Sequence, residues 1–340
     1  MEASATKPQA KSMNTTATSE QTYLRTELER RRERLHTAVH TTEADASLSR
    51  LLSEVDAALA RMDQGAYGIC DSCQGKVETD RLLRDPLLHV CLECLSQEEQ
   101  RALESDLELA ARIQRALLPS ANLSPAGWHV RYHYAPAGAV SGDYCDLLES
   151  KDGLLFLLGD VSGKGVAASM LMSHLHATFR SLADAKIPLQ ELVEAANRLF
   201  CESTLAGQYA TLIVGRAESD GTVEYISAGH LPLLHVQAVG TTEHEATGVP
   251  LGMFCNSRFA VRRLSLLPGD SLLLYTDGLT ESRNTSGDEY GICRLTNLAA
   301  LHGGSSPDRL ISECLSNLQA FSAREKHGDD LTVLVLRRSD

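Results

Sequence analysis

Several aspartates in this 340-residue chain lie at the ends of apolar runs that resemble strands, where a rigid backbone can hold a carboxylate in a cleft. Taken singly, each has a plain explanation, because Asp-Gly is ordinary turn chemistry and an aspartate before a strand is often a solvated cap. Together they form an oxygen-rich set without a histidine cluster, which favours a hard cation such as Mg2+ or Mn2+ over zinc. The positions are Asp143, Asp160, Asp277, Asp329 and Asp330.

Such a carboxylate set predicts a particular kind of chemistry. Carboxylates a few ångströms apart repel one another, and one or two divalent ions are the usual compensation. A two-metal centre lowers the pKa of a shared water and orients that water for in-line attack on phosphorus. We therefore expect hydrolysis of a phosphate ester.

Four cysteines form a second pattern, in which two CxxC pairs are separated by seventeen residues. Two thiolates on each of two turns can complete a tetrahedron around Zn2+, and this segment has too few apolar residues for a core of its own. A redox CxxC and a chance cluster are the alternatives, and the paired spacing favours one structural zinc. The predicted ligands are Cys70, Cys73, Cys91 and Cys94.

Other potentially reactive residues are assigned structural roles. His230 lies in SAGHLP at a strand turn, where a histidine that bonds the local backbone is more common than a catalytic one. The remaining cysteines have no metal spacing and are expected to be small buried hydrophobes. These are Cys145, Cys201, Cys255, Cys293 and Cys314.

Composition excludes several classes of function. The formal net charge of −13 would repel a phosphate backbone, so we expect no direct binding to nucleic acid. No apolar run reaches the roughly 18 to 20 residues of a membrane span, and the first residues lack the apolar stretch of a signal peptide. We therefore expect a cytoplasmic protein without membrane contact, whose cysteines are reduced.

The elements that must position these residues begin with a helical region. Residues 1–21 have the composition of a disordered tail. Apolar positions at helical spacing over 22–40 and again over 48–62, on either side of a polar break, predict a short antiparallel helical hairpin. The hairpin leads into the cysteine segment, so that 22–96 form one hairpin and zinc-finger module.

Residues 97–119 are expected to be a helical linker, with a charged helix over 97–118 that ends at Pro119. Its apolar stripe predicts either packing on the catalytic domain or pairing with a second chain as a short coiled coil. We favour the homodimer, with Gln114 keeping the pairing marginal so that the helix acts as a switch. The stripe consists of Leu103, Leu107, Ala110, Ile113 and Leu117.

From Trp128 onward the sequence changes to short apolar strands separated by Gly, Asp and Pro turns. Helices are expected at about 165–183, 188–203 and 306–324. Runs of strands broken by helix pairs predict an α+β fold with mostly antiparallel sheets and helices on their outer faces. The catalytic domain should span residues 120–338.

Two resemblances sharpen these expectations, and the first concerns the zinc module. Over residues 22–100, the hairpin, the GxYGxC segment and RLLRDP resemble the DksA/TraR zinc-finger family. The resemblance implies RNA polymerase as a partner, reached through its secondary channel. At the hairpin tip, where that family carries acidic residues, this chain has Glu43 and Asp45.

The second resemblance covers about residues 105–338. SGDYCD, DVSGKGVAASM, SAGHLPLL, TGVPLGM, PGDSLLLYTDGLTES and GDDLTVLVL occur in the order of the SpoIIE/RsbU-type branch of the protein phosphatase 2C (PPM) family. It implies a β-sandwich flanked by helices, with two Mn2+ or Mg2+ ions at its edge. It also implies a protein serine/threonine phosphatase acting on a phosphorylated anti-anti-sigma (STAS-domain) protein in sigma-factor signalling.

This resemblance also implies separate roles for the acidic residues. Asp143 would hold one metal largely through water, Asp160 would bridge both, and the carbonyl of Val161 would complete the second site. Asp277 and Asp329 would hold the first metal, with Asp330 as a neighbour or alternative ligand.

The loop that follows Asp160 is a candidate phosphate-binding site. It comprises Ser162, Gly163, Lys164 and Gly165 and leads into a helix, so its backbone N–H groups could meet an anion. Eukaryotic relatives carry a histidine just after the bridging aspartate as a candidate general acid, whereas this chain has Ser162.

Two other functions compete with the phosphatase. The zinc hairpin could make the chain an RNA polymerase-binding transcription regulator. It could also make the chain a sensor whose helix 97–118 transmits a signal such as a change in redox state. Retention of every acidic motif favours the enzyme.

Overall fold

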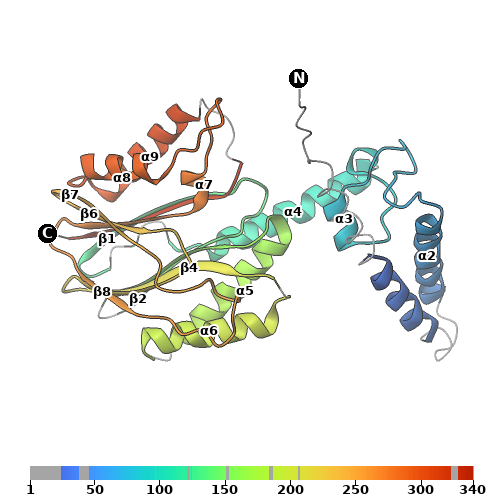
Figure 1. Cartoon of the computed structure of the whole chain (residues 1–340), viewed down its shortest axis with the longest axis horizontal. Helices are drawn as coiled ribbons and strands as arrows, with labels where there is room; N and C mark the ends of the chain where they lie inside the picture. Colours follow the sequence, from blue (N-terminus) through green and yellow to red (C-terminus); the bar gives the residue numbers. More distant parts are fainter. Residues whose placement is uncertain are drawn as a thin grey trace, which may run out of the picture. The chain divides into compact units, whose positions relative to one another are not determined.

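The structure is a computed structural model of the chain (Figure 1). It describes residues 24–37, 46–95, 97–120, 123, 125–150, 153–183, 187–205, 207–322 and 328–339. The predicted tail 1–21 and the hairpin tip with Glu43 and Asp45 lie outside these residues. The chain divides into two compact units between Ser105 and Asp106.

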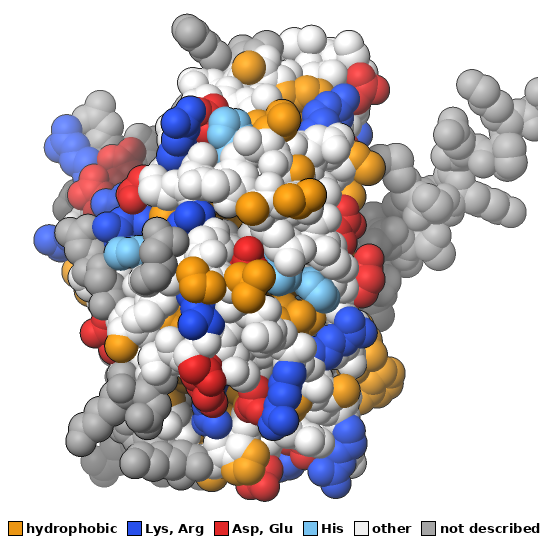
Figure 2. Space-filling model, turned by 90° about the vertical axis from the view of Figure 1, so that its left-hand side faces the viewer, with side chains coloured by type: hydrophobic (Ala, Val, Ile, Leu, Met, Phe, Trp, Pro, Cys, Tyr) orange, Lys and Arg blue, Asp and Glu red, His pale blue; other side chains and the backbone are white. Residues whose placement is uncertain are grey.

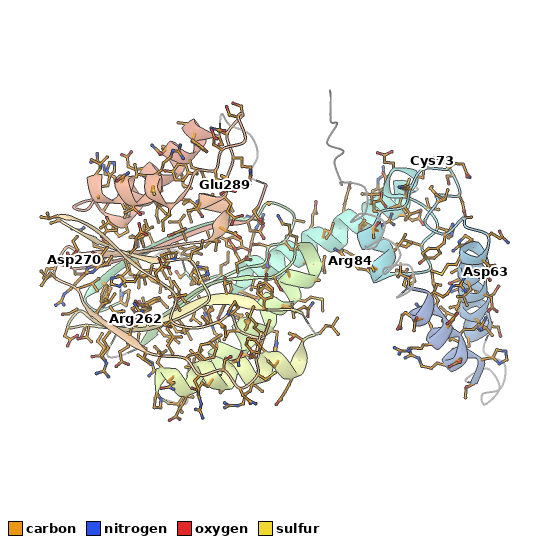
Figure 3. The ribbon with its side chains drawn as sticks, in the orientation of Figure 1. Asp63, Cys73, Arg84, Arg262, Asp270 and Glu289 are labelled. Carbon is orange, nitrogen blue, oxygen red and sulfur yellow. The ribbon has the colours of Figure 1, made fainter. Side chains whose placement is uncertain are left out.

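The first unit contains the predicted helical hairpin. Helical residues 24–37 and α2 (Ala46–Asp63) run antiparallel, because Arg25 at the start of one helix pairs with Asp63 at the end of the other (Figure 3). Leu28, Val55 and Leu59 form the small core between them. The cysteine segment follows, with α3 (Thr79–Arg84) and the one-turn helix η1 (Leu92–Cys94).

Helix α4 (Gln97–Leu117) has nearly the predicted bounds, and its packing face agrees in part with the predicted stripe, since Leu107, Ala110 and Leu117 are partly buried. Leu103 and Ile113, which belong to the expected stripe, are exposed, whereas Gln114 is buried against the second unit's own loop at Ser141. The most deeply buried residue of this face is an amide with two backbone hydrogen bonds rather than a hydrocarbon side chain. Gln114 therefore does not lie in an exposed seam.

The second unit is a sandwich of two antiparallel five-stranded sheets. The first sheet has the order β1-β10-β9-β6-β7 and the second has the order β2-β3-β4-β5-β8. The strands of the first sheet are β1 (Trp128–Ala135), β6 (Leu233–Gln237), β7 (Gly240–His244), β9 (Ser271–Tyr275) and β10 (Leu331–Arg338). Those of the second are β2 (Asp143–Ser150), β3 (Gly153–Val161), β4 (Ala210–Glu218), β5 (Thr222–Ala228) and β8 (Arg262–Ser265).

Helices cover both outer faces of the sandwich (Figure 1). α5 (Gly165–Ala183) and α6 (Leu189–Ser203) pack on the second sheet, while α8 (Ile292–Leu301) and α9 (Pro307–Phe321) pack on the first. A third apolar cluster lies between the sheets. The α+β sandwich flanked by helices is thus confirmed.

The sequence prediction missed two helices in this unit, α8 and the one-turn α7 (Asp277–Thr280). In α8 the fully buried positions are Leu295 and Ala299, a single i,i+4 pair that gives little periodic signal. α7 is too short to have a period.

The expectation that the remaining cysteines are buried holds only in part. Cys145 and Cys314 are buried, Cys201 is partly buried, and Cys255 and Cys293 are exposed. Cys255 lies in a surface loop and Cys293 in the first turn of α8, where small residues need not face the core. No described helix combines the length and the apolar character of a membrane span.

Candidate active site

The two sheets each contribute part of the acidic set at one edge of the sandwich. Asp143 opens β2, Asp160 lies near the end of β3, and the two are direct cross-strand partners. Their side chains therefore leave the same face of the second sheet. This pairing brings together two residues that the sequence separates by an entire hairpin.

The other sheet supplies Asp277 and Asp329. Asp277 follows β9 and Asp329 precedes β10, and these two strands pair antiparallel. Gly278 allows the close approach, because a Cβ there would lie 2.0 Å from the carbonyl oxygen of Asp330. The glycine of the TDG motif is thus required by backbone contact, beyond its ordinary use in turns.

Two threonines join the sheets at Asp143, and sequence reasoning missed both. Thr276 Oγ1 donates to Asp143 Oδ2 at 2.9 Å, and Thr332 Oγ1 donates to the same oxygen. The backbone N–H of Thr332 donates to Thr276 Oγ1 at 2.9 Å. We call this buried pair the threonine clamp. The only sequence signal for it is that each threonine lies within three residues of a predicted ligand.

Around Asp143 and Asp160, the site has the features that a cation would require. Asp143 Oδ1 is buried without a hydrogen-bond partner, although Oδ2 of the same carboxylate has two. A Cβ at Gly142 would lie 3.0 Å from the carbonyl oxygen of Val161 and 3.3 Å from Asp160 Oδ1, so glycine keeps this space open. An all-oxygen donor set of this kind fits Mg2+ or Mn2+.

Burial and mutual repulsion shift the titration of these carboxylates. Burial raises the pKa of Asp143 well above its ordinary value, and nearby Asp160 and Asp330 add to the shift. Burial, followed by the charges of Asp277 and Asp329, raises the pKa of Asp160 to about 7. The pKa of Asp277 is also raised, mainly by burial and by Asp329. A bound cation would reverse these shifts because it stabilises the ionised forms.

Asp330 has different contacts from its neighbour. Its Oδ1 accepts the N–H of Ala137 at 2.7 Å, and its Oδ2 accepts the N–H of Gly142 at 2.8 Å. Both oxygens therefore brace the loop that leads into Asp143. The same loop is held from the other side by Gln114, whose amide exchanges two hydrogen bonds with the backbone of Ser141, of 2.7 and 2.9 Å.

The candidate phosphate-binding loop has some of its groups already engaged. Ser162 exchanges hydrogen bonds with the backbone of Tyr209, through its N–H at 2.9 Å and its Oγ at 3.0 Å. Lys164 Nζ lies 2.7 Å from Asp329 Oδ2 and donates to the carbonyl of Gly328 at 3.2 Å. The lysine thus lies directly beside the acidic set.

His230 has the features of a structural residue. It is buried, its Nδ1 lies 2.8 Å from Thr211 Oγ1, and its Nε2 lies 3.1 Å from the carbonyl oxygen of Tyr275. Burial lowers its pKa to about 4, so the ring is neutral near pH 7. Both ring nitrogens are engaged, which matches the structural role expected from the sequence.

The four cysteines of the first unit come together as their spacing predicts. One sulfur from each of Cys70, Cys73, Cys91 and Cys94 lies within 4.8 Å of the others. The N–H of Cys91 approaches Cys70 Sγ at 3.4 Å, and this bond is the largest cause that lowers the pKa of Cys70 to about 6. An all-thiolate set fits Zn2+. Among the described residues, no carboxylate group is gathered as tightly.

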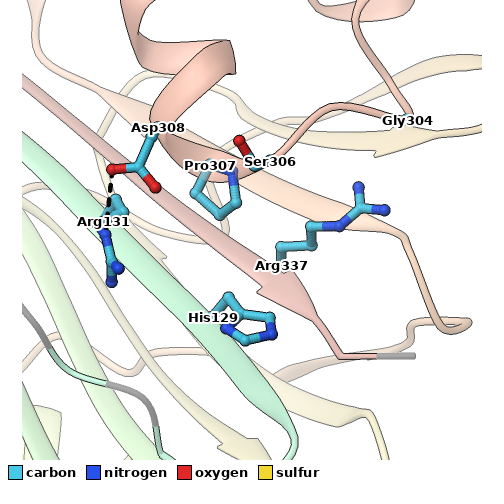
Figure 4. Close-up of a pocket in the computed structure, with 7 residues that line it drawn as sticks. All are labelled: His129, Arg131, Gly304, Ser306, Pro307, Asp308 and Arg337. Carbon is cyan, nitrogen blue, oxygen red and sulfur yellow. Dashed lines mark hydrogen bonds and ion pairs between the residues drawn. The ribbon is translucent and has the colours of Figure 1, made fainter.

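A cavity of about 370 Å³ lies away from the acidic set (Figure 4). Arg337 lines it near the end of β10, whereas Asp329 precedes the start of that strand, so roughly 25 Å of strand separates them. The other lining residues are His129, Arg131, Gly304, Ser306, Pro307 and Asp308. Arg131 pairs with Asp308 at 3.1 Å.

The end of the second unit seen in Figure 2 carries no large area of one charge. Among the described residues there, acidic, basic and apolar side chains are intermingled. This face therefore lacks the continuous basic surface with which proteins grip nucleic acid.

Comparison with known proteins identifies the class of fold. The SiaA-PP2C domain of Pseudomonas aeruginosa superposes with a TM-score of 0.63 at 20% sequence identity, covering 72% of this chain and 98% of that one. The sandwich is thus a PP2C-type phosphatase fold.

The family is defined by sequence. Residues 150–339, more than half of the chain, match the family model of Stage II sporulation protein E, so the chain belongs to the SpoIIE family. Phosphoserine phosphatase RsbU of Bacillus subtilis is 28% identical over 245 residues, covering 70% of this chain and 72% of RsbU. The chain is a protein serine/threonine phosphatase of this family.

A solved structure agrees with this assignment. The RsbU and RsbW domains of Rv1364c from Mycobacterium tuberculosis are 32% identical, with a TM-score of 0.57, over 65% of this chain and 62% of that one.

Proposed function

We propose that the second unit hydrolyses phosphoserine or phosphothreonine on a STAS-domain protein, using two Mn2+ or Mg2+ ions, within bacterial sigma-factor signalling. The observation that carries this proposal is the buried, unpartnered Oδ1 of Asp143, a residue whose direct cross-strand partner is Asp160. Such an oxygen is costly to bury unless a cation or a donor meets it.

Both sheets would supply ligands for the metal ions. Asp143, Asp160 and the Val161 carbonyl from one sheet, with Asp277 and Asp329 from the other, would hold the ions. When bound, such ions lower the pKa of an attacking water and neutralise charge on phosphoryl oxygens.

Other side chains would keep these ligands in place and meet the substrate. Asp330 and the threonine clamp fix the backbone and rotamer of Asp143. Lys164 and the N–H groups of Gly163 and Gly165 at the start of α5 would meet the phosphoryl oxygens, since they border the acidic set.

The substrate class is inferred from relatives. One relative is named phosphoserine phosphatase RsbU, and a solved relative contains an RsbU domain and an RsbW domain in one protein. We infer that this chain also acts in a signalling switch, in which removal of a phosphoryl group from one protein changes the partner that this protein binds. A cytoplasmic location is part of the same proposal.

For the first unit we propose one structural Zn2+ held by the four cysteines, in a module of DksA/TraR type that covers residues 22–96. The cluster and the antiparallel hairpin support this proposal. RNA polymerase is the alternative partner for this unit. A homodimer through α4 would use its exposed apolar residues, such as Leu103 and Ile113.

The function is tested by assaying the full-length protein against p-nitrophenyl phosphate and a phosphorylated STAS-domain protein, with Mn2+, with Mg2+ and with excess EDTA. We expect turnover of both substrates with either metal and none in EDTA. Asp160→Asn is the matched inactive control. Full turnover in EDTA, or wild-type activity in the Asp160→Asn variant, would refute the proposed site.

A further inference from the structure

Large apolar side chains are exposed on three segments of the second unit, and one of these segments is hydrogen-bonded to Ser162, two residues after Asp160. Met170 in α5 is 68% exposed, and in two loops Leu205 is 75%, Tyr209 39%, Met253 45% and Phe254 63% exposed. We call these five residues the apolar rim. Single exposed apolar residues are ordinary, but several on adjoining segments usually mark a contact surface.

Backbone hydrogen bonds connect the two loops to the metal-site strand. Tyr209 exchanges two hydrogen bonds with Ser162, which lies two residues after Asp160. The next residue, Ala210, exchanges two more with Leu251, of 2.8 and 2.9 Å. The loops that carry Tyr209 and Met253 therefore both begin beside the carboxylates.

The loop that carries Met253 and Phe254 is held firmly although its side chains are exposed. Asn197 of α6 is fully buried, and its amide donates to the carbonyls of Phe254 at 2.9 Å and Cys255 at 3.1 Å. Its Oδ1 accepts the N–H of Gly252 at 2.9 Å. A loop bonded in this way presents its apolar side chains in a fixed place, which lowers the entropy lost on binding.

Met170 extends the rim onto α5. It lies one turn before His174, whose ring stacks on Phe200 of α6 with the centroids 6.1 Å apart. Phe200 in turn packs against the loop at Gly252, where a Cβ would lie 2.8 Å from its ring. These contacts place the middle of α5, the end of α6 and the 252–255 loop beside one another.

We propose that the apolar rim is the docking surface for the phosphorylated protein substrate. This inference rests on the proposed function and adds how the protein partner is recognised. Ser162 and Tyr209 lie close to Asp160 in the chain and through their hydrogen bonds, so the surface around a phosphoserine bound at Asp160 would lie near these residues.

Electrostatics favours an apolar contact at this place. The chain has a net charge of −13, so outside the metal site a phosphorylated partner gains little from long-range attraction. Burial of apolar area between the proteins does not depend on charge. The partner should therefore expose apolar side chains next to its phosphoserine.

The test separates docking from chemistry. Leu205→Ser and Phe254→Ser should each raise KM for the phosphorylated STAS-domain protein by roughly tenfold, the effect of removing one central apolar contact. Values of kcat and KM for p-nitrophenyl phosphate with Mn2+ should stay unchanged, because that ester is too small to reach the rim. Val239→Ser and Leu301→Ser, at residues 95% and 81% exposed and outside the rim, are the matched controls.

Each other outcome has a definite meaning. Equal losses on both substrates would overturn the proposal, because the rim would then be supporting the fold. Unchanged KM for the phosphoprotein would overturn it directly. A changed sedimentation coefficient in the variants that tracks the loss would show instead that the rim joins two copies of this chain. Absence of Mn2+-dependent hydrolysis of either substrate by the unmodified protein would refute the proposed function itself.

Discussion

The cysteine cluster and the acidic set are both candidate metal sites, but the fold builds them in different ways. The four cysteines come from one stretch of 25 residues, numbers 70 to 94, and their sulfurs lie within 4.8 Å of one another. The carboxylates come from two sheets and span nearly 190 residues, from Asp143 to Asp329. Local spacing can specify the first site, whereas the second exists only when the whole sandwich has formed.

The largest expected effect comes from removing a carboxylate from the acidic set. Asp160→Asn and Asp277→Asn should each lower kcat by several orders of magnitude, because each removes charge that holds metal while leaving the shape unchanged. Circular dichroism and the zinc content should be those of the unmodified protein. Turnover close to normal in either variant would mean that the site lies elsewhere.

The second prediction concerns removal of two cysteines from the cluster in the first unit. A Cys70→Ser/Cys94→Ser double variant should fall from about one zinc per chain to almost none, because two thiolates cannot complete the tetrahedron. Helical signal from the first unit should decrease, and proteolysis there should become faster. Mn2+ affinity of the acidic set should not change. Zinc retained at full stoichiometry, measured by mass spectrometry, would exclude these ligands.

The threonine clamp allows a finer test of how the acidic site is assembled. Thr276→Val/Thr332→Val should weaken Mn2+ binding roughly 10- to 100-fold, the usual effect of losing the hydrogen bonds that orient a metal ligand. Isothermal titration measures this without catalysis, and Thr→Ser at both positions should restore the affinity. Thr247→Val, which removes a hydroxyl bonded to the backbone of Ser227, is the matched control. An equal loss of Mn2+ affinity in the Thr247→Val control would show that the clamp only contributes to the stability of the fold.

The acidic site should also respond to pH near neutrality. Folding raises the pKa of Asp160 to about 7 from an ordinary 3.8, so without metal the fold binds this proton more tightly than the unfolded chain does. The protonated Asp160 carboxyl therefore contributes to the free energy of unfolding fully below pH 3.8, its ordinary pKa, and this contribution is lost as the pH rises through about 7. Mn2+ must displace the proton, so its affinity should fall about tenfold per pH unit below 7. Calorimetry in buffers of different ionisation enthalpy should detect proton release, and Asp160→Asn should reduce it, because the pKa values of Asp143 and Asp277 are raised as well.

The smallest expected effect concerns α4, which contains the boundary between the two units. Ile113→Asp should weaken self-association in sedimentation, because Ile113 is exposed whereas its neighbour Gln114 is bonded within the catalytic unit. Mn2+ affinity should be unchanged, since Asp143 and its supports are untouched. If the Ile113→Asp variant has the same sedimentation coefficient as the unmodified protein at all concentrations, α4 is not a dimer contact. Leu107→Asp, on the partly buried side of the helix, is the comparison variant and should also lower activity.

The sequence was sufficient where spacing or motif order carried the signal. It predicted that the four cysteines would come together and that Asp143 and Asp160 would lie near one another. It also predicted the sandwich class and, closely, the bounds of α5 and α4. It did not reveal the threonine clamp, because the sequence does not distinguish a buried threonine from an exposed one. Only the pairing of β9 with β10 brings Thr276 next to Thr332. The sequence placed Leu107, Ala110 and Leu117 correctly on the packed face of α4, but hydrophobic periodicity could not show that Gln114 is buried there with its hydrogen bonds made inside the catalytic unit.

The contacts of Asp329 and Asp330 bear on how such motifs evolve. Two identical letters stand side by side, yet the first faces the acidic set and Lys164, while the second spans a backbone loop through Ala137 and Gly142. If Asp329 holds metal as proposed, selection at position 329 would act through chemistry, whereas selection at position 330 would act through the shape of the 137–142 loop. Invariance of both letters among relatives would therefore record two unrelated constraints, and a lineage that abandoned catalysis would be free to lose the first long before the second.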